Sequence, residues 1–174
     1  MITIRPEGPQ DIAAIYRINE QAFQGSTEAE LVDRLREQKK LLISLVAEAD
    51  GDIVGHIAFS RVGIDSGGQL SGVGLGPMAV QPGKQNLGIG SQLVHAGLKI
   101  CREMRFDYVV VLGHANYYPR FGFTPASQFG LRCIWPVADE IFMAIELRPG
   151  ALSEVNGLVN YDSAFTNEKD QTIG

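Results

Sequence analysis

The sequence predicts a single α/β domain, residues 1–174, with a mixed, mostly antiparallel sheet, a parallel strand pair at its centre and helices on both faces. Three observations lead to this fold class. An apolar strand, a glycine-rich turn, a helix and a second apolar strand follow one another between residues 73 and 112. Two apolar runs of hairpin type precede this unit, and two further strand-like runs follow it. A strand, crossover helix and strand of this kind form a parallel pair.

Composition narrows the class of protein. A chain of 174 residues with 45% hydrophobic content suits one soluble domain with a core of its own. The net charge of -5 argues against nucleic-acid binding, which depends on clustered Lys and Arg. The N-terminus lacks the pattern of a signal peptide, and no apolar run is long enough to cross a bilayer. We therefore expect a cytoplasmic protein with neither a nucleic-acid nor a membrane partner.

Two cysteines occur in the chain, Cys101 and Cys133. Neither has the neighbouring Cys or His residues that metal-ligand spacing requires. We expect both to be buried thiols and predict no metal site.

The first part of the chain predicts one strand and two helices. Ile2 to Arg5 is strand-like, and Gly8-Pro9 begins a helix that ends at Gly25. Thr27 and Glu30 have the spacing of a capping box at the start of the second helix. Each helix carries apolar residues at helical spacing: Ile12, Ile15, Tyr16, Ala22 and Phe23 in the first, and Leu31, Val32 and Leu35 in the second.

A hairpin follows. Leu42 to Ala49 and Ile53 to Val62 are β-branched apolar runs separated by Asp50-Gly51, a pair suited to a tight turn. His56 lies in the second run, and we interpret it as a hydrogen-bonded sheet residue in preference to a catalytic one. Asp65 to Gly68 supplies the next turn.

The segment from Val73 to Met104 is the centre of the prediction. A strand ends at Val80, a turn follows, and a helix begins after Gly88 and Gly90. The start of a helix presents backbone N–H groups and partial positive charge, so this turn is suited to hold a phosphate, with Lys84 supplying a full charge. The buried face of the helix is expected to carry Ile89, Leu93, Ala96, Gly97, Ile100 and Met104.

Further strands are predicted after this helix. Tyr108 to Leu112 is almost purely apolar, as in a strand covered on both faces, and Phe129 to Trp135 and Ile141 to Leu147 are two more. The tail from residue 151 is too apolar for disorder as far as Phe165, whereas residues 167–174 are expected to be flexible.

Since parallel strands end at the same edge of a sheet, the turn after Val80 and the segment from Gly113 to Phe123 should meet at that edge.

Two motifs carry a family resemblance. Gln85-x-x-Gly88-x-Gly90, after a strand ending in Met78-Ala79-Val80, resembles the acetyl-coenzyme A signature of the GNAT superfamily of N-acyltransferases. Tyr118-x-x-x-Gly122-Phe123 looks like a second segment of that family, and Gly113-His114 before it is similar to a bacterial subgroup of acetyltransferases.

The resemblance implies a fold, a co-substrate and a binding site. The fold is the acyl-CoA N-acyltransferase (GNAT) fold, in which the central parallel pair splays to admit acetyl-CoA. The backbone of the central strand would hold the pantetheine arm and face the developing oxyanion, and the following turn would hold the diphosphate. The implied cofactor-binding residues are Met78, Ala79, Val80, Lys84, Gln85, Asn86, Leu87, Gly88, Ile89, Gly90, Ser91 and Asn116.

The catalytic groups are less completely specified. Tyr118 matches the family tyrosine near the coenzyme sulfur and is the candidate acid, although it could instead pack among its aromatic neighbours. Many relatives use an acidic base in the central strand, but Val73 to Val80 contains neither Asp nor Glu. His114 is the nearest titratable option, or the amine is captured already neutral. Arg120 and Arg132 either contact coenzyme phosphates or cover the surface.

The predicted function is acetyl transfer from acetyl-CoA to a primary amine of a small molecule or protein, by direct attack. The missing carboxylate keeps a second hypothesis open, a non-catalytic acyl-CoA-binding regulatory module. A nucleotide-binding enzyme is disfavoured because the turn lacks the G-x-x-x-x-G-K-[ST] and full G-x-G-x-x-G patterns. The sequence leaves the acceptor unidentified and a homodimer open.

Overall fold

The computed structural model describes residues 1–65 and 68–166. The chain divides into two compact units, the first made of Met1–Ser60 and Gly76–Ile100, the second of Arg61–Leu75 and Cys101–Gly174. Three elements contribute residues to both units: β3 (Asp52–Ile64), β4 (Gly72–Val80) and α3 (Ile89–Glu103).

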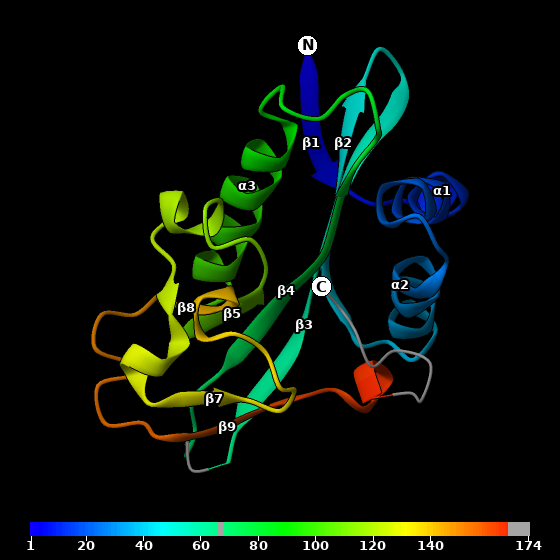
Figure 1. Ribbon diagram of the computed structural model, residues 1–174. Coiled ribbons are helices and arrows are strands. Elements are labelled where there is room, and N and C mark those ends of the chain that lie inside the picture. The colour runs from blue at the N-terminus through cyan, green and yellow to red at the C-terminus, as the bar shows by residue number, and fades with distance from the viewer. Residues whose placement is uncertain (66–67, 167–174) are drawn as a thin grey trace. The chain divides into compact units, whose positions relative to one another are not determined.

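An antiparallel sheet with helices on both faces forms the first unit. Strand β2 (Leu41–Ala49) pairs antiparallel with β1 (Ile2–Pro6) and with β3. Asp50 and Gly51 join β2 to β3 with φ values of 52° and 86°, the left-handed conformations that the predicted tight turn requires. Figure 1 shows α1 (Ile12–Phe23) and α2 (Thr27–Glu37) on one face of this sheet and α3 on the other. The predicted arrangement of helices is confirmed here.

The buried side of α2 includes the predicted residues, whereas in α1 only Ile15 of the predicted apolar set is fully buried and the other four are half-buried. The buried residues are Ile15, Ile18 and Asn19 in α1, and Ala29, Leu31, Val32 and Leu35 among the apolar residues of α2. The predicted capping box at Thr27 is wrong, because Ser26 precedes the helix and Thr27 is its first residue. Ser26 donates its hydroxyl to the Glu30 carboxylate at 3.1 Å, so the polar pair forms one position earlier.

Helix α3 begins where the sequence predicted and ends one residue earlier. Its most buried residues are Ile89, Leu93, Val94, Gly97, Leu98 and Cys101. Met104, predicted on the buried face, is 49% exposed. The reason is that Arg105 takes a left-handed φ of 63°, which turns the chain away from the helix and leaves Met104 facing solvent.

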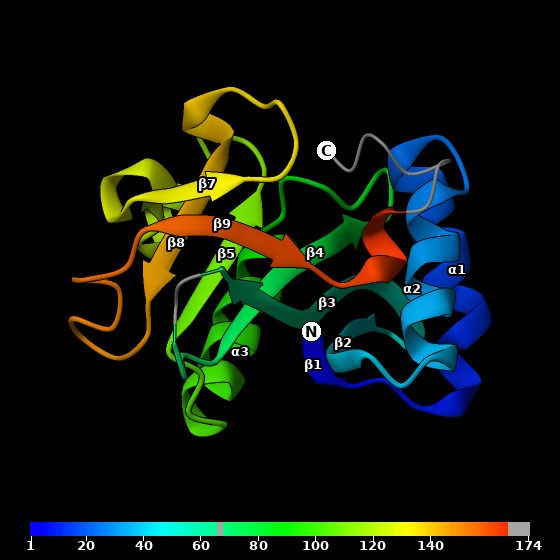
Figure 2. The ribbon, with the colours of Figure 1, turned by 90° about the horizontal axis from the view of Figure 1, so that it is seen from below.

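The second unit contains the parallel pair. The end of β3 and the start of β4 continue into it, and its other strands are β5 (Tyr108–Leu112), β6 (Thr124–Pro125), β7 (Leu131–Cys133), β8 (Phe142–Glu146) and β9 (Gly157–Tyr161). β4 pairs parallel with β5 from Gly72 to Leu75, and β8 pairs antiparallel with β5 and β6. Figure 2 shows β7 along β9, which are parallel, and β9 also pairs antiparallel with β3. The predicted mixed, mostly antiparallel sheet is confirmed.

Several predicted segments differ from the structure. Phe129 was predicted to begin a strand, but it ends a 3-10 turn, η3 (Ala126–Phe129), and β7 is shorter than the predicted 129–135. Strands β6 and β9 were not predicted as strands, although order up to Phe165 was. Of the predicted turn 65–68, residues 66–67 lie outside the described residues, as do residues 167–174.

Within the described ranges, no helix has the length and apolar character that crossing a bilayer requires. The expectation of a single domain spanning residues 1–174 stays a prediction.

Candidate active site

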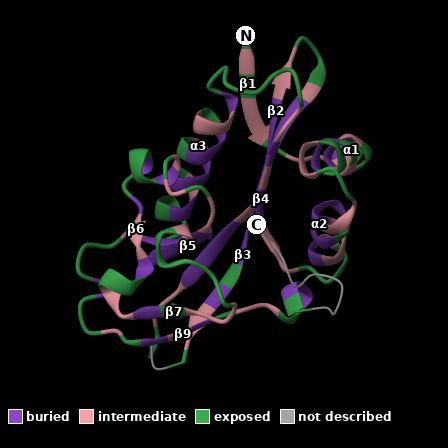
Figure 3. Ribbon diagram, viewed as in Figure 1, coloured by how far each residue is buried: buried purple, intermediate pink, exposed green. Residues whose placement is uncertain are grey.

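The connection between β4 and α3 is an exposed loop. Residues 82–88 are all solvent-exposed, as Figure 3 shows in green, and Ile89 is the first buried residue of the helix. The Gly88 carbonyl accepts the first helical hydrogen bond, from Gln92 N at 3.1 Å. In the described part of the chain, the amides of Asn86 to Gly90 donate to no backbone carbonyl. These donors lie at the positive end of the helix dipole and are suited to an anion.

The backbone of this loop takes left-handed conformations at three positions, Gly83 with a φ of 89° and two residues closer to α3. Asn86 has a φ of 62° and Gly88 a φ of 82°, a region that glycine enters without steric cost. A Cβ atom at Gly88 would have no described protein atom within 4 Å. The space beside Gly88 is therefore open to a ligand that approaches the backbone.

Side chains of the motif fix the loop. The Gln85 side-chain amide donates to the Val80 carbonyl at 3.2 Å, and Lys84 N donates to the Gln81 carbonyl at 2.9 Å. Lys84 and Leu87 are exposed, and Ser91 lies half-buried in the first helical turn. Gln85 thus holds the start of the loop against the end of β4, while the Lys84 ammonium remains accessible.

The end of β4 is the predicted pantetheine strand. Ala79 is buried, whereas Met78 and Val80 are half-buried, as alternation along a strand dictates. The parallel register with β5 ends at Leu75, and β4 continues past it through Gly76, whose φ is 139°. The irregularity expected of this glycine-rich strand therefore falls at Gly76.

Tyr118 belongs to the second unit. It begins the 3-10 turn η2 (Tyr118–Phe121) and is 6% exposed. A Cβ atom at Gly113 would lie 2.3 Å from Tyr118 Cε2, so the absence of a side chain there lets the ring lie on the backbone. The ring also meets Phe123 edge-on at 5.7 Å. Burial raises the pKa of Tyr118, so its phenol stays protonated at neutral pH.

His114 and Asn116 lie in the same turn, and both are exposed. The His114 carbonyl accepts hydrogen bonds from Tyr117 N at 3.0 Å and Tyr118 N at 3.3 Å. Arg120 donates Nε to the Tyr117 carbonyl at 3.0 Å and lies over the Tyr117 ring at 4.6 Å. The turn thus brings His114, Asn116 and Tyr118 together in the second unit, while the residues from Met78 to Ser91 lie together in the first.

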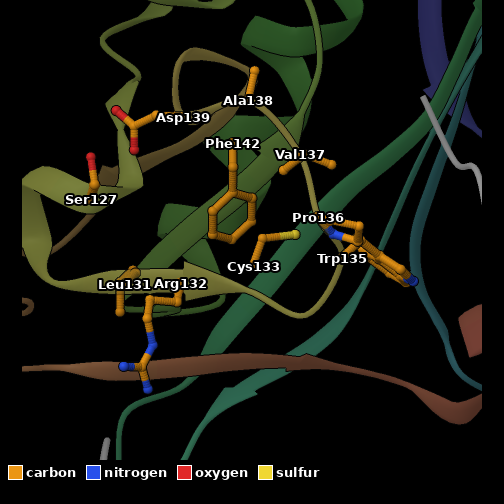
Figure 4. A pocket seen from close by; sticks show the side chains of 10 residues that line it. All are labelled: Ser127, Leu131, Arg132, Cys133, Trp135, Pro136, Val137, Ala138, Asp139 and Phe142. Carbon is orange, nitrogen blue, oxygen red and sulfur yellow. The ribbon is translucent and has the colours of Figure 1, made fainter.

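A pocket in the second unit was not predicted from the sequence. Its volume is about 250 Å³, and the apolar side chains that line it include Leu131, Cys133, Val137 and Phe142. Figure 4 shows the Phe142 ring beside the Cys133 thiol, with the Arg132 guanidinium directed away from both. Its lining comes from η3, β7, β8 and the segment between the two strands, so no local sequence pattern marks it.

The two cysteines are weakly reactive. Burial raises the pKa of Cys101 to about 12, and it also raises the pKa of half-buried Cys133. Across residues 1–65 and 68–166, no group of three or more His, Cys, Asp or Glu side chains is placed to hold a metal ion.

His56 is the centre of a buried hydrogen-bond chain in the first unit. Asn19 Nδ2 donates to His56 Nδ1 at 3.3 Å, and Ser44 Oγ lies 2.8 Å from His56 Nε2. Because Ser44 donates its own proton to Glu7 Oε2 at 2.8 Å, it must accept from Nε2. Arg36 Nε donates to the other oxygen of Glu7 at 2.9 Å. The imidazole is therefore a neutral sheet residue with both nitrogens paired, as expected.

The hydrogen-bond chain around His56 leads us to predict that the folded protein loses stability in mild acid. Burial is the largest influence on the pKa of His56 and lowers it to about 4, against the attraction of Glu7. The unfolded chain then binds more protons between pH 6.5 and 4, so stability falls over that window by about 3 kcal/mol. Burial alone would raise the pKa of Glu7, but hydrogen bonds from Arg36 and Ser44 lower it, and its contribution is lost only at more acidic pH.

We expect His56→Gln to flatten the curve of unfolding free energy against pH between 6.5 and 4.5. Urea unfolding at several pH values measures this slope. His95→Gln, at an exposed histidine of α3, is the matched control for the loss of an imidazole. An unchanged slope in His56→Gln would mean that His56 is not responsible for the acid sensitivity.

Comparison with known proteins identifies the family to which the chain is similar. A family model described as "Acetyltransferase (GNAT) domain" matches residues 3–126. The chain is 39% identical to the uncharacterized N-acetyltransferase YhbS of Escherichia coli (strain K12) over 163 residues, 93% of this chain and 97% of the relative.

Two solved structures are also similar. The crystal structure of YhbS from Escherichia coli in complex with CoA has a TM-score of 0.91 and 38% identity, and the alignment covers 96% of this chain and 93% of that one. A GNAT family acetyltransferase from Brucella melitensis in complex with acetyl-CoA has a TM-score of 0.80 and 38% identity, covering 95% and 98%.

Proposed function

This chain belongs to the GNAT family of acetyltransferases, and from that membership we propose that it transfers the acetyl group of acetyl-CoA to a primary amine. The observation that carries the proposal is the loop between β4 and α3, with its available amides from Asn86 to Gly90 and the open space at Gly88. The similar chains crystallised with CoA and with acetyl-CoA support the choice of co-substrate.

The loop would hold the diphosphate of acetyl-CoA through backbone amides, with Lys84 adding a positive charge. The backbone of Met78, Ala79 and Val80 would hold the pantetheine arm and direct a donor to the developing oxyanion. Asn116, exposed in the second unit, is a further candidate for contact with the pantetheine arm. Every residue in this set except Asn116 lies in the first unit.

The proposed chemistry is direct attack. The neutral amine nitrogen adds to the thioester carbonyl carbon, and the tetrahedral intermediate collapses as the carbon–sulfur bond breaks. The departing sulfur takes a proton from the Tyr118 hydroxyl, and the nitrogen gives up its own proton to a base or to water. His114 is the candidate base, because it is exposed in the same turn and β4 offers no carboxylate from Val73 to Val80.

We place this reaction in the cytoplasm, with a small-molecule or protein amine as acceptor and a homodimer as the candidate assembly. The net charge of -5 supports a cationic partner over nucleic acid.

The experiment that tests the function follows coenzyme thiol release from acetyl-CoA with and without a panel of primary amines. An acetyltransferase releases thiol faster with at least one amine class, in a saturable manner, and yields the acetylated amine by mass spectrometry.

The same experiment tests a second candidate, a non-catalytic acyl-CoA-binding module. The absence of an acidic residue in β4 favours that candidate. Tight acetyl-CoA binding with no amine-dependent release across the whole panel would support it and contradict the transferase.

A further inference from the structure

Both ends of the loop between β4 and α3 contact the same short stretch of β3. At the first end, Gln81 N donates a hydrogen bond to the Val54 carbonyl at 2.9 Å. Gln81 is the residue that follows β4, so this bond fixes the point at which the chain leaves the sheet. All of these residues belong to the first unit.

At the second end, α3 begins directly over Gly55. A Cβ atom at Gly55 would lie 3.1 Å from Ile89 Cγ2 and 3.0 Å from Leu93 Cδ1, closer than carbon atoms normally approach. It would also lie 3.3 Å from the Cβ of Ala47 on β2. Ile89 is the first residue of α3 and is 3% exposed. The first turn of the helix therefore lies so close to the sheet that a side chain at residue 55 would have to push Ile89 and Leu93 away by a few tenths of an ångström.

The two contacts differ in how easily they could give way. The Leu93 methyl is the far end of a side chain that can change rotamer. The Ile89 Cγ2 atom is attached directly to Cβ, so it moves only by rotation about χ1, which the buried surroundings of Ile89 restrict, or together with the backbone. A side chain at Gly55 would consequently displace the backbone of Ile89, together with the amides beside it.

Residue 55 itself is held in place. The preceding residue, Val54, is bonded to Gln81, and the following residue, His56, is fully buried and bonded to Asn19 and Ser44. Gly55 also pairs with Ala47 of β2. The strand at this point is held along both edges, by Gln81 on one side and by β2 on the other, so strain introduced at Gly55 would be relieved in the helix.

We propose that Gly55 is a positioning residue for the coenzyme: it sets the distance between the start of α3 and the end of β4, and thereby the placement of the amides that hold the diphosphate. The proposal rests on the proposed function of this loop. It assigns Gly55 no contact with the coenzyme.

The test compares Gly55→Ala with Gly63→Ala. Gly63 lies on the same strand, and a Cβ atom there meets no atom of the described residues within 4 Å. Calorimetry with CoA measures affinity, and steady-state kinetics compares acetyl-CoA with acetyl-pantetheine, which lacks the diphosphate. Gly55→Ala should weaken CoA binding by about tenfold and raise KM for acetyl-CoA by a similar factor, since about 1.4 kcal/mol corresponds to tenfold. Its kcat/KM for acetyl-pantetheine should stay at the wild-type value, and Gly63→Ala should match wild type throughout.

A second-site variant separates positioning from general damage. Ile89→Ala removes the methyl group that meets the new Cβ atom, so Gly55→Ala combined with Ile89→Ala should recover CoA affinity to the level of Ile89→Ala alone. The inference is overturned if Gly55→Ala binds CoA like wild type, if acetyl-pantetheine use falls as much as acetyl-CoA use, or if the double variant shows no recovery. A wild-type protein that binds no CoA would instead overturn the proposed function, and this inference with it.

Discussion

Valine in place of Gly88 is expected to weaken CoA binding by about 100-fold. The native φ of 82° is strained for a β-branched residue, so the loop would take another conformation and its amides would turn from the ligand. Loss of two charge-assisted hydrogen bonds of about 1.5 kcal/mol each corresponds to about 100-fold in Kd. Calorimetry with CoA measures the change.

The matched control for this prediction is Gly51→Val. Gly51 has a φ of 86°, and a Cβ atom there would, among the described residues, also meet nothing within 4 Å. It lies in the turn between β2 and β3, so both variants carry a comparable backbone strain. Gly51→Val should lose stability to a similar extent and keep its affinity for CoA. If the two variants lost affinity equally, strain would explain the effect and the loop would not be the diphosphate site.

Removal of the Tyr118 hydroxyl should lower kcat by about 100-fold, the lower end of the range for a general acid. Tyr118→Phe keeps the ring, which fills the space over Gly113 and contacts Phe123, so the fold and the affinity for CoA should be retained. Because burial raises the pKa of Tyr118, the wild-type enzyme should also keep its acid in the protonated form as far as about pH 10. Steady-state kinetics with an amine that supports turnover measures both effects.

Tyr117→Phe provides the comparison. Tyr117 is the adjacent residue, and its ring centroid lies 5.1 Å from that of Tyr118. The substitution likewise removes only a phenolic hydroxyl group. We expect near wild-type kcat for this variant. Normal turnover in Tyr118→Phe would remove Tyr118 from the mechanism and leave it with a packing role.

Local signals account for the parts of the fold that the sequence predicted. The turn at Asp50-Gly51 needs left-handed backbone at both residues, and this pair supplies it at little cost. The start of α3 follows a glycine-rich turn in the same way. The end of α3 was predicted one residue too late, because apolar periodicity continues through Met104 while the backbone already turns at Arg105.

The missed strands depend on distant partners. β9 is ordered through pairing with β3 and β7, neither of which is its neighbour in sequence, and β6 spans two residues. Strand formation reflects such tertiary pairing more than intrinsic preference, so short strands leave little trace in a single sequence.

The same distinction between local signals and distant partners applies to the residues of the candidate site. Gln85 and Gly88 could be predicted because the loop is one continuous motif. Gly55 could not, because its importance lies in the side chains of Ile89 and Leu93, which approach it only once α3 packs on the sheet. The residues of the His56 hydrogen-bond chain come from α1, α2, β2 and the residue that follows β1, and no spacing rule connects them.

The raised pKa values of Cys101 and Cys133 have a practical consequence for enzymology. Electrophilic dyes that report liberated coenzyme react with thiolates, and near pH 7.5 an ordinary thiol is ionised to a far greater extent than a buried one. The protein should therefore contribute little background colour of its own, even at the high concentrations needed to detect a poor acceptor.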